Sequence, residues 1–236
     1  MSSQIRISAK NLGSIALKDF CPRCFWIKLK LENKLPFQIF PGIFSSIDSY
    51  TKTIVHSWFD IKGKQPDWLN SLGKFKGYMN PPHHSKFNSF LNEFNILLTG
   101  SPDGILIHED NTISIIDYKT AKFTSTQDSL FPMYEAQLNS YGLIAKQLAY
   151  PKINQLALIY AEPITSGEKS LLEEYYHEYG FAMGFSAHIE MVKLDTSILD
   201  PLFDKFRNLY DMNKIPERSE NCKDCEYTES LVSLFD

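Results

Sequence analysis

The chain lacks the features that mark membrane and secreted proteins. Its 236 residues contain no apolar run long enough to span a bilayer, and residues 1–10 lack the apolar stretch of a signal peptide. It has no internal repeat and no low-complexity tract. We therefore expect a cytoplasmic protein with no membrane partner, folded as a single domain over residues 1–236.

The chain also lacks the strong positive charge of proteins that coat nucleic acid, since its net charge is −4. The charge is uneven, however. Residues 1–100 hold 13 Lys and Arg against 6 Asp and Glu, a charge of +7, whereas residues 101–236 carry −11. A basic first half is typical of a phosphate-facing surface. For each lysine taken alone, a purely solubilising role is the plainer interpretation.

Cysteine is scarce and occurs only in pairs. Cys21 and Cys24 lie near the start of the chain, and Cys222 and Cys225 lie near its end. Each Cys-x-x-Cys pair has chelate spacing, and four thiolates complete a tetrahedral zinc site or hold a 4Fe–4S cluster. Either group would join the two ends of the chain as a clasp. A redox dithiol, two disulfides or free thiols are the alternatives, and a cytosolic location disfavours stable disulfides.

Two short apolar runs separated by a polar turn predict a β-hairpin with acidic residues. Asp103 precedes the first run, and Asp117 and Lys119 end the second. Residues two apart on a strand face the same side, so Asp117 and Lys119 point together, and strand pairing brings Asp103 near them. Neighbouring carboxylates repel each other and lose hydration, and a hard divalent cation relieves both costs. The plainer alternative is an ordinary Pro-Asp-Gly turn followed by a neutralising ion pair.

The segment after the hairpin has the amphipathic pattern of a helix at about residues 133–148. Gln137 and Tyr141 are four residues apart and therefore share a face of that helix. An amide and a phenol beside a metal site suit a phosphate and its attacking water. Taken alone, Gln137 fits a solvated helix position and Tyr141 a core aromatic.

The motifs Gly-x-x-Asp (100–103), Asp-x-Lys (117–119) and Gln-x-x-x-Tyr (137–141), in this order, resemble the PD-(D/E)XK nuclease superfamily. The similarity is closer to its RecB-like branch, which includes CRISPR-associated exonucleases with a cysteine-bound cluster. It covers a core of about residues 42–160 and the cysteines at both ends. The resemblance implies a restriction-endonuclease-like α/β fold, in which helices flank a central mixed β-sheet in the order α-β-β-β-α-β.

The resemblance also implies roles for the residues that match its motifs. Asp103 and Asp117 would be ligands of Mg²⁺ or Mn²⁺, and the carbonyl of Tyr118 would be a further ligand. Lys119 would orient the nucleophilic water. Gln137 and the tyrosine four residues after it would support the site.

Two elements of the resembled pattern are less clear in this chain. Related nucleases carry a His or Glu on a helix before the first strand. Here His56, on a helix expected at about residues 45–59, is the candidate, with Asp48 and Glu93 as alternatives. The related exonucleases also have one early and three late cysteines, whereas this chain has two and two. Zinc and a 4Fe–4S cluster therefore both stay open.

The sequence thus favours a metal-dependent nuclease that hydrolyses DNA phosphodiester bonds, and the resemblance implies a role in DNA repair, recombination or defence. RNA stays open as a substrate. A noncatalytic nucleic-acid-binding module with a structural four-cysteine metal site is the main alternative. A redox or scaffold protein held by its cysteines is the third hypothesis. The acid–acid–lysine set favours the enzyme, because a pure binder has no need of it.

The remaining elements can be placed only coarsely. We expect further helices at about residues 24–31 and 197–212, and strands near residues 94–99, 103–107, 112–118 and 155–160. Residues 174–194 are expected to add strands, and residues 61–93 to form a long irregular stretch. In that stretch Phe75, Tyr78 and Phe87 either stack on single-stranded bases or pack the loop onto the body.

Overall fold

The structure is a computed structural model that describes residues 4–34, 41–124 and 129–234. Its helices are α1 (Ala9–Ser14), α2 (Pro22–Lys30), α3 (Gly42–Lys62), α4 (Phe131–Gln147), α5 (Gly167–Ser170), α6 (Asp200–Asp211) and α7 (Lys223–Val232), with 3₁₀ turns at Asp67–Leu72, Glu173–Tyr175 and Thr196–Leu199. Its strands are β1 (Ile5–Ser8), β2 (Phe75–Met79), β3 (Asn88–Leu91), β4 (Ile96–Thr99), β5 (Gly104–His108), β6 (Ile113–Lys119), β7 (Ile153–Pro163), β8 (Tyr176–His177), β9 (Gly180–Phe181) and β10 (Phe185–Val192). Across these described ranges, no helix has the length and apolarity needed to cross a membrane.

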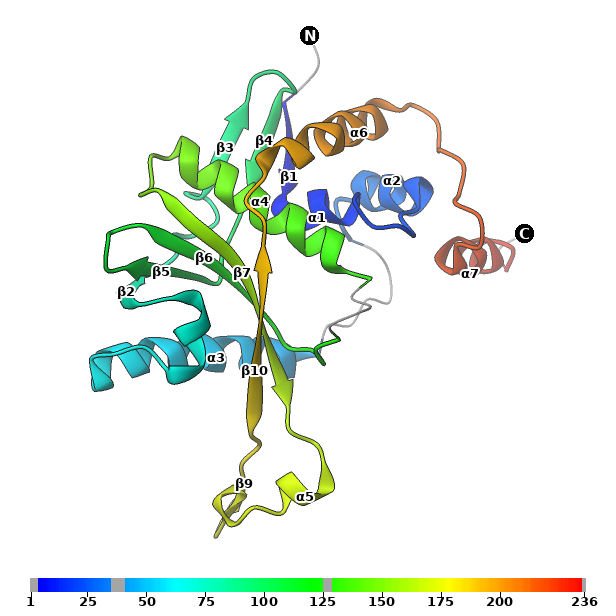
Figure 1. Cartoon of the computed structure of the whole chain (residues 1–236). Helices are drawn as coiled ribbons and strands as arrows, with labels where there is room; N and C mark the ends of the chain where they lie inside the picture. Colours follow the sequence, from blue (N-terminus) through cyan, green and yellow to red (C-terminus); the bar gives the residue numbers. More distant parts are fainter. Residues whose placement is uncertain (1–3, 35–40, 125–128, 235–236) are drawn as a thin grey trace.

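A mixed five-stranded sheet organises the fold, in the strand order β10-β7-β6-β5-β2. Only the central pair, β6 and β7, is parallel, and helix α4 makes the crossover between these two strands. The other neighbours in the sheet are antiparallel. The hairpin of β5 and β6 therefore lies inside a mixed sheet flanked by helices, which is the expected fold class (Figure 1).

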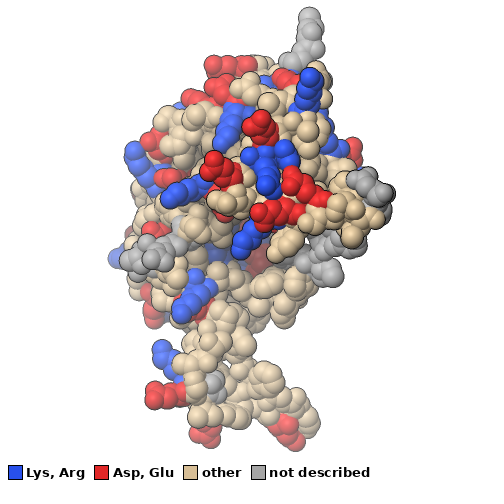
Figure 2. All heavy atoms as spheres, turned by 90° about the vertical axis from the view of Figure 1, so that its right-hand side faces the viewer, with Lys and Arg blue, Asp and Glu red and all other residues tan. Residues whose placement is uncertain are grey.

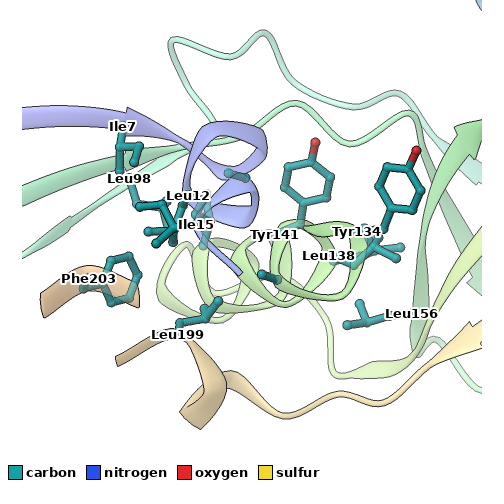
Figure 3. Packing of buried hydrophobic residues seen from close by; sticks show 14 of the residues in the cluster. Ile7, Leu12, Ile15, Leu98, Tyr134, Leu138, Tyr141, Leu156, Leu199 and Phe203 are labelled. Atoms are coloured by element: carbon teal, nitrogen blue, oxygen red, sulfur yellow. The ribbon is translucent and has the colours of Figure 1, made fainter. Parts of the chain in front are cut away.

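Strand β6 divides its side chains between two hydrophobic cores, one on each face of the sheet. Ile115 packs in the core that contains α4 and α6, together with Leu138 of α4. Figure 3 shows part of this core, with Leu138 of α4 near Leu156 of β7 and with Phe203 of α6 at the other end of the cluster. Ile116 packs in the second core, against Phe59 of α3. The sheet is covered on both faces, so β6 is buried from Ile113 to Tyr118 rather than alternating between buried and exposed residues.

Residues 61–93 are not the irregular stretch expected from their prolines and glycines. They contain a 3₁₀ turn and the strands β2 and β3. Phe75 and Phe87 are buried, and Tyr78 stacks on the ring of His56 at a centroid distance of 3.9 Å. These aromatics therefore pack the segment onto the body, and the base-stacking alternative is wrong for the two buried phenylalanines.

The sequence reasoning also missed β1, which pairs in parallel with β4 in a second sheet of order β1-β4-β3. Its signal is short: buried Ile5 and Ile7 alternate with two polar residues. At the opposite end of the molecule, β7 and β10 extend beyond the body and carry α5, β8 and β9 as an arm (Figure 1). Figure 2 shows acidic and basic side chains interspersed over the body, whereas the charged side chains in view on this arm are mostly acidic.

Candidate active site

Asp103 and Asp117 lie beside each other because β5 and β6 pair as an antiparallel hairpin. Asp103 directly precedes β5, and its backbone N–H donates to the carbonyl of Ile116 at 3.2 Å. Asp117 follows Ile116 on β6 and is 3% exposed. The charge of Asp103 contributes to a raised pKa of Asp117, so the two carboxylates interact electrostatically.

The carboxylate of Asp103 is fixed by one contact to each of its oxygens. Oδ2 accepts a hydrogen bond from the backbone N–H of Tyr118 at 2.9 Å, across the hairpin. Oδ1 forms an ion pair with Lys52 Nζ at 2.8 Å, and Lys52 comes from the middle of α3. Burial raises the pKa of Asp103, and the Lys52 charge and the Tyr118 N–H oppose that rise.

Asp117, Lys119 and the two motif residues of α4 form one connected polar cluster. Lys119 Nζ lies 2.5 Å from Asp117 Oδ2 and donates to Gln137 Oε1 at 3.3 Å. Gln137 Nε2 donates to Asp117 Oδ1 at 3.1 Å and to the Tyr141 hydroxyl at 2.7 Å. Burial raises the pKa of Asp117 to about 6, against the opposing charge of Lys119. The structure thus brings Asp103, Asp117, Lys119, Gln137 and Tyr141 into one site.

Two aromatic side chains of α4 line the site. Tyr134 and Tyr141 project from the same side of the helix (Figure 3). The ammonium of Lys119 lies 4.0 Å from the centroid of the Tyr134 ring, a cation–π distance. Tyr141 lies against Gly100, where an added Cβ would come within 2.7 Å of its ring, so this position has no room for a side chain. The sequence reasoning missed Tyr134.

The site lies in a cleft with a volume of about 810 Å³, which is large enough to admit part of a phosphate backbone. Both aspartates, Lys119 and the two α4 motif residues line it. Arg6 of β1 and Lys10 of α1 also line it, and they add positive charge from a strand that the sequence reasoning did not recognise. Such positive charge, near but outside the acidic centre, suits a phosphate backbone.

His56, the leading candidate for the early element of the site, lies outside the cleft. His56 lies on α3, but its ring stacks on Tyr78, and it does not line the cleft. Burial lowers its pKa. Asp48, two helical turns earlier, does line the cleft, and Lys52 Nζ lies 2.7 Å from its Oδ2. Glu93 follows β3 and lines a different, smaller hollow. The i,i+4 pair of Asp48 and Lys52 was the available signal for this part of the site.

The residues of the cleft fit a hard divalent cation. Asp117 is almost completely buried, and within the described residues its Oδ2 accepts no hydrogen bond of good geometry, although the Lys119 ammonium is close. A buried carboxylate is costly unless positive charge lies beside it, and a divalent cation would add to the charge that Lys119 supplies. Two carboxylates and a backbone carbonyl are the oxygen ligands that Mg²⁺ and Mn²⁺ prefer. Asp103, Asp117 and the carbonyl of Tyr118 are therefore the residues that would hold the ion.

The four cysteines meet at a second site, which we call the cysteine clasp (Cys21, Cys24, Cys222 and Cys225). Cys21 precedes the first turn of α2 and Cys222 that of α7, so each pair occupies the start of a helix. All four Sγ atoms lie within 4.8 Å of one another. Figure 1 shows α2 and α7 side by side, although about 200 residues separate them in sequence.

The four thiols of the clasp affect one another's ionisation. Burial opposes ionisation of Cys21, but hydrogen bonds from the Cys24 and Ser219 backbones and from neighbouring thiols lower its pKa to about 6. Burial and the neighbouring thiols raise the pKa of Cys24. Together they also raise the pKa of Cys225, to about 11. The Cys21 thiol therefore ionises easily, whereas Cys24 and Cys225 resist a second negative charge. A bound cation removes that resistance, as thiolate-binding metals do.

Comparisons with known proteins show which family the chain belongs to. A search of curated proteins found no match. Among solved structures, the chain matches one described as "Crystal structure of SSO0001", with 13% identity over 97% of this chain and 86% of that chain, and a TM-score of 0.45. A family model described as "PD-(D/E)XK nuclease superfamily" matches residues 61–230, a span that includes both aspartates, Lys119 and the α4 motif. Since this match covers more than half of the chain, the protein belongs to the PD-(D/E)XK nuclease superfamily.

Proposed function

We propose that this protein is a Mg²⁺- or Mn²⁺-dependent nuclease that hydrolyses phosphodiester bonds of DNA. The observation that carries the proposal is the cluster in which Asp117 contacts both Lys119 and Gln137, with Asp103 beside it. A divalent cation held there would supply Lewis acidity to the phosphate and would neutralise charge that develops on the departing oxygen.

The protein side chains provide the rest of the chemistry. The Lys119 ammonium has its position set by Asp117, Gln137 and the Tyr134 ring, so it can hold and align an attacking water by hydrogen bonding. Gln137 fixes the Asp117 carboxylate through one oxygen, and the Lys119 ammonium lies 2.5 Å from the other. Arg6 and Lys10 are suited to bind the phosphates on either side of the scissile bond.

The test is a digestion panel of end-labelled linear DNA, circular single- and double-stranded DNA, and RNA, each with Mg²⁺ or with EDTA. We expect Mg²⁺-dependent cleavage of DNA by the wild type. Asp117→Ala and Lys119→Ala should each reduce the rate by about 10²-fold or more. Lys62→Ala, at the exposed last turn of α3, is the matched control and should cleave as the wild type does.

Two outcomes would contradict the proposal. If both active-site variants cleave DNA as fast as the wild type, the activity belongs to other residues or to a contaminant. If the wild type binds DNA but does not cleave it with either metal, the noncatalytic binding module is the better description. Cleavage of circular substrates would assign an endonuclease, whereas cleavage restricted to free ends would assign an exonuclease.

We further propose that the cysteine clasp holds a single tetrahedral ion, zinc, rather than a 4Fe–4S cluster. Tetrahedral zinc with Zn–S bonds of about 2.3 Å requires sulfurs about 3.8 Å apart. In a four-iron cluster each thiolate binds a different iron, which separates the sulfurs by about 6 Å. The Sγ distances here are 3.3 Å for Cys24–Cys225, 3.5 Å for Cys24–Cys222 and 3.6 Å for Cys21–Cys225, and they support the single ion.

Metal analysis of anaerobically purified protein tests the clasp. We expect about one zinc per chain and a colourless protein. Cys24→Ser together with Cys222→Ser should remove that zinc and lower the melting temperature, because the link between α2 and α7 is lost. A brown protein with about four irons per chain and a broad band near 400 nm would contradict the proposal.

A further inference from the structure

Lys52 of α3 contacts two carboxylates of the cleft at once. Its Nζ lies 2.8 Å from Asp103 Oδ1 and 2.7 Å from Asp48 Oδ2. Both carboxylates lie within ion-pair distance of the same ammonium, so Lys52 bridges Asp48 of its own helix and Asp103 just before β5. Its side chain is only 30% exposed, and this bridge is therefore partly shielded from solvent.

Each carboxylate of the cleft has a lysine ammonium beside it. Asp117 is paired with Lys119, and Asp103 is paired with Lys52. Asp48 is the third carboxylate of the cleft and shares the Lys52 ammonium. With Arg6 and Lys10 of the cleft lining, three carboxylates face four cationic side chains, which leaves a net charge of +1. One divalent cation brings this charge to +3 and a second would bring it to +5, which only the incoming phosphate would offset.

The positions of the carboxylates also favour a single divalent cation in the cleft. In the described part of the chain, the cysteine clasp is where three or more potential ligand atoms approach one another within 4.8 Å. Asp48 does not approach Asp103 and Asp117 closely enough to join such a group, and the Lys52 ammonium lies between Asp48 and Asp103. A cation that bridged these two carboxylates would have to occupy the place of that ammonium.

We propose that Lys52 is a built-in counter-ion that takes the place of a second metal ion, so that the cleft binds one divalent cation. This inference rests on the proposed function, because it assumes that the cleft takes Mg²⁺ or Mn²⁺. Lys52 is thus a positioning residue. It holds Asp103 in the orientation in which Asp103 and Asp117 can share an ion, and it keeps Asp48 from acting as a ligand.

The test counts the metal ions rather than measuring activity. Protein that retains its cysteine-bound metal is titrated with Mn²⁺ in a calorimeter, and the Mn²⁺ spectrum is recorded by electron paramagnetic resonance. We expect one Mn²⁺ per cleft in the wild type. Lys52→Met keeps the length and apolar volume of the side chain but removes its charge. It should bind two Mn²⁺ ions, with the broadened spectrum of a spin-coupled pair.

Two further variants make the test specific. Asp48→Asn combined with Lys52→Met removes the ligand that the second ion needs, so it should return the count to one. Lys62→Met makes the same substitution in the last turn of the same helix and should leave the count at one. If Lys52→Met does not fold, Lys52→Gln serves in its place, since it also removes the charge but keeps a polar end.

Each outcome decides between the two proposals. Two Mn²⁺ ions in the wild type, or one ion in both Lys52→Met and Lys52→Gln, would overturn the role of Lys52 and leave the nuclease proposal standing. Absence of any Mn²⁺ binding in the wild type would overturn the nuclease proposal itself. The melting temperature in EDTA gives a second readout. It should fall in Lys52→Met, because Asp48 and Asp103 lose their counter-ion, and Mn²⁺ should restore it more than in the wild type.

Discussion

Replacing Gln137 with leucine tests whether the α4 amide organises the site. The side chain is 6% exposed, and leucine has a similar size, so the substitution removes polar contacts without opening a large cavity. It leaves the buried Asp117 Oδ1 and the Tyr141 hydroxyl without their donor. Loss of a partner for a buried charged acceptor costs about 2–3 kcal/mol, and loss of the neutral hydrogen bond costs about 1 kcal/mol. Against a small gain from the more apolar side chain, we expect a net loss of about 3 kcal/mol.

Urea unfolding in EDTA, followed by circular dichroism, measures this loss. In a domain of this size about 3 kcal/mol corresponds to a fall in melting temperature of roughly 6–12 °C. Gln147→Leu makes the same substitution at the exposed end of α4 and should change stability by less than about 0.5 kcal/mol. Equal unfolding free energies for the two variants would refute the reasoning, because Gln137 would then make no net contribution to the buried cluster.

Three further substitutions test other parts of the structure. Gly100→Ala should cost about 1–3 kcal/mol of stability and reduce cleavage, because the new Cβ would approach the Tyr141 ring to 2.7 Å. Gly77→Ala, with open space around it, is the control. Equal melting temperatures for the two variants would contradict the close packing of Gly100 against Tyr141. Replacing a helical glycine with alanine usually stabilises the helix by about 1 kcal/mol. In Gly13→Ala, however, the new Cβ would collide with the Met133 carbonyl oxygen, so we expect destabilisation in urea melts. A gain in stability would show that α1 and α4 pack less closely. Burial lowers the pKa of His108 in the folded protein below its ordinary value of about 6.5. The stability that the neutral His108 side chain contributes is therefore complete above about pH 6.5. It is lost as pH falls toward the folded-state pKa, at up to about 1.4 kcal/mol per pH unit. His108→Gln should therefore have a flatter stability profile than the wild type between pH 7 and pH 5, and parallel profiles would argue against a buried neutral imidazole.

The central hairpin and the helix after it could be predicted because their signals are local. The apolar runs before Asp117 and after Asp103 fix the strand pairing, and the four-residue spacing of Gln137 and Tyr141 fixes their shared face on α4. The mixed sheet follows from these elements and from the apolar run of β7. The family model supports this fold class and the superfamily.

The contact of Lys52 with Asp103 and the positions of Arg6 and Lys10 could not be predicted, because they depend on how distant elements pack. Lys52 reaches Asp103 across 51 residues of sequence, and only the placement of α3 over the sheet brings the two together. Arg6 and Lys10 line the cleft because β1 pairs with β4, and four residues of alternating pattern are too short to establish that strand. The same dependence on packing explains His56. It lies on a helix, as expected, but the orientation of that helix directs the His56 ring toward Tyr78.

The most direct test of the account is to locate the metal. Crystals of the protein soaked in Mn²⁺ should give an anomalous diffraction peak within bonding distance of one oxygen of Asp103, one oxygen of Asp117 and the carbonyl oxygen of Tyr118. The peak should disappear in Asp117→Asn crystals under the same conditions. A well-ordered cleft with no peak between the two aspartates, at Mn²⁺ concentrations that support DNA cleavage, would contradict the central claim.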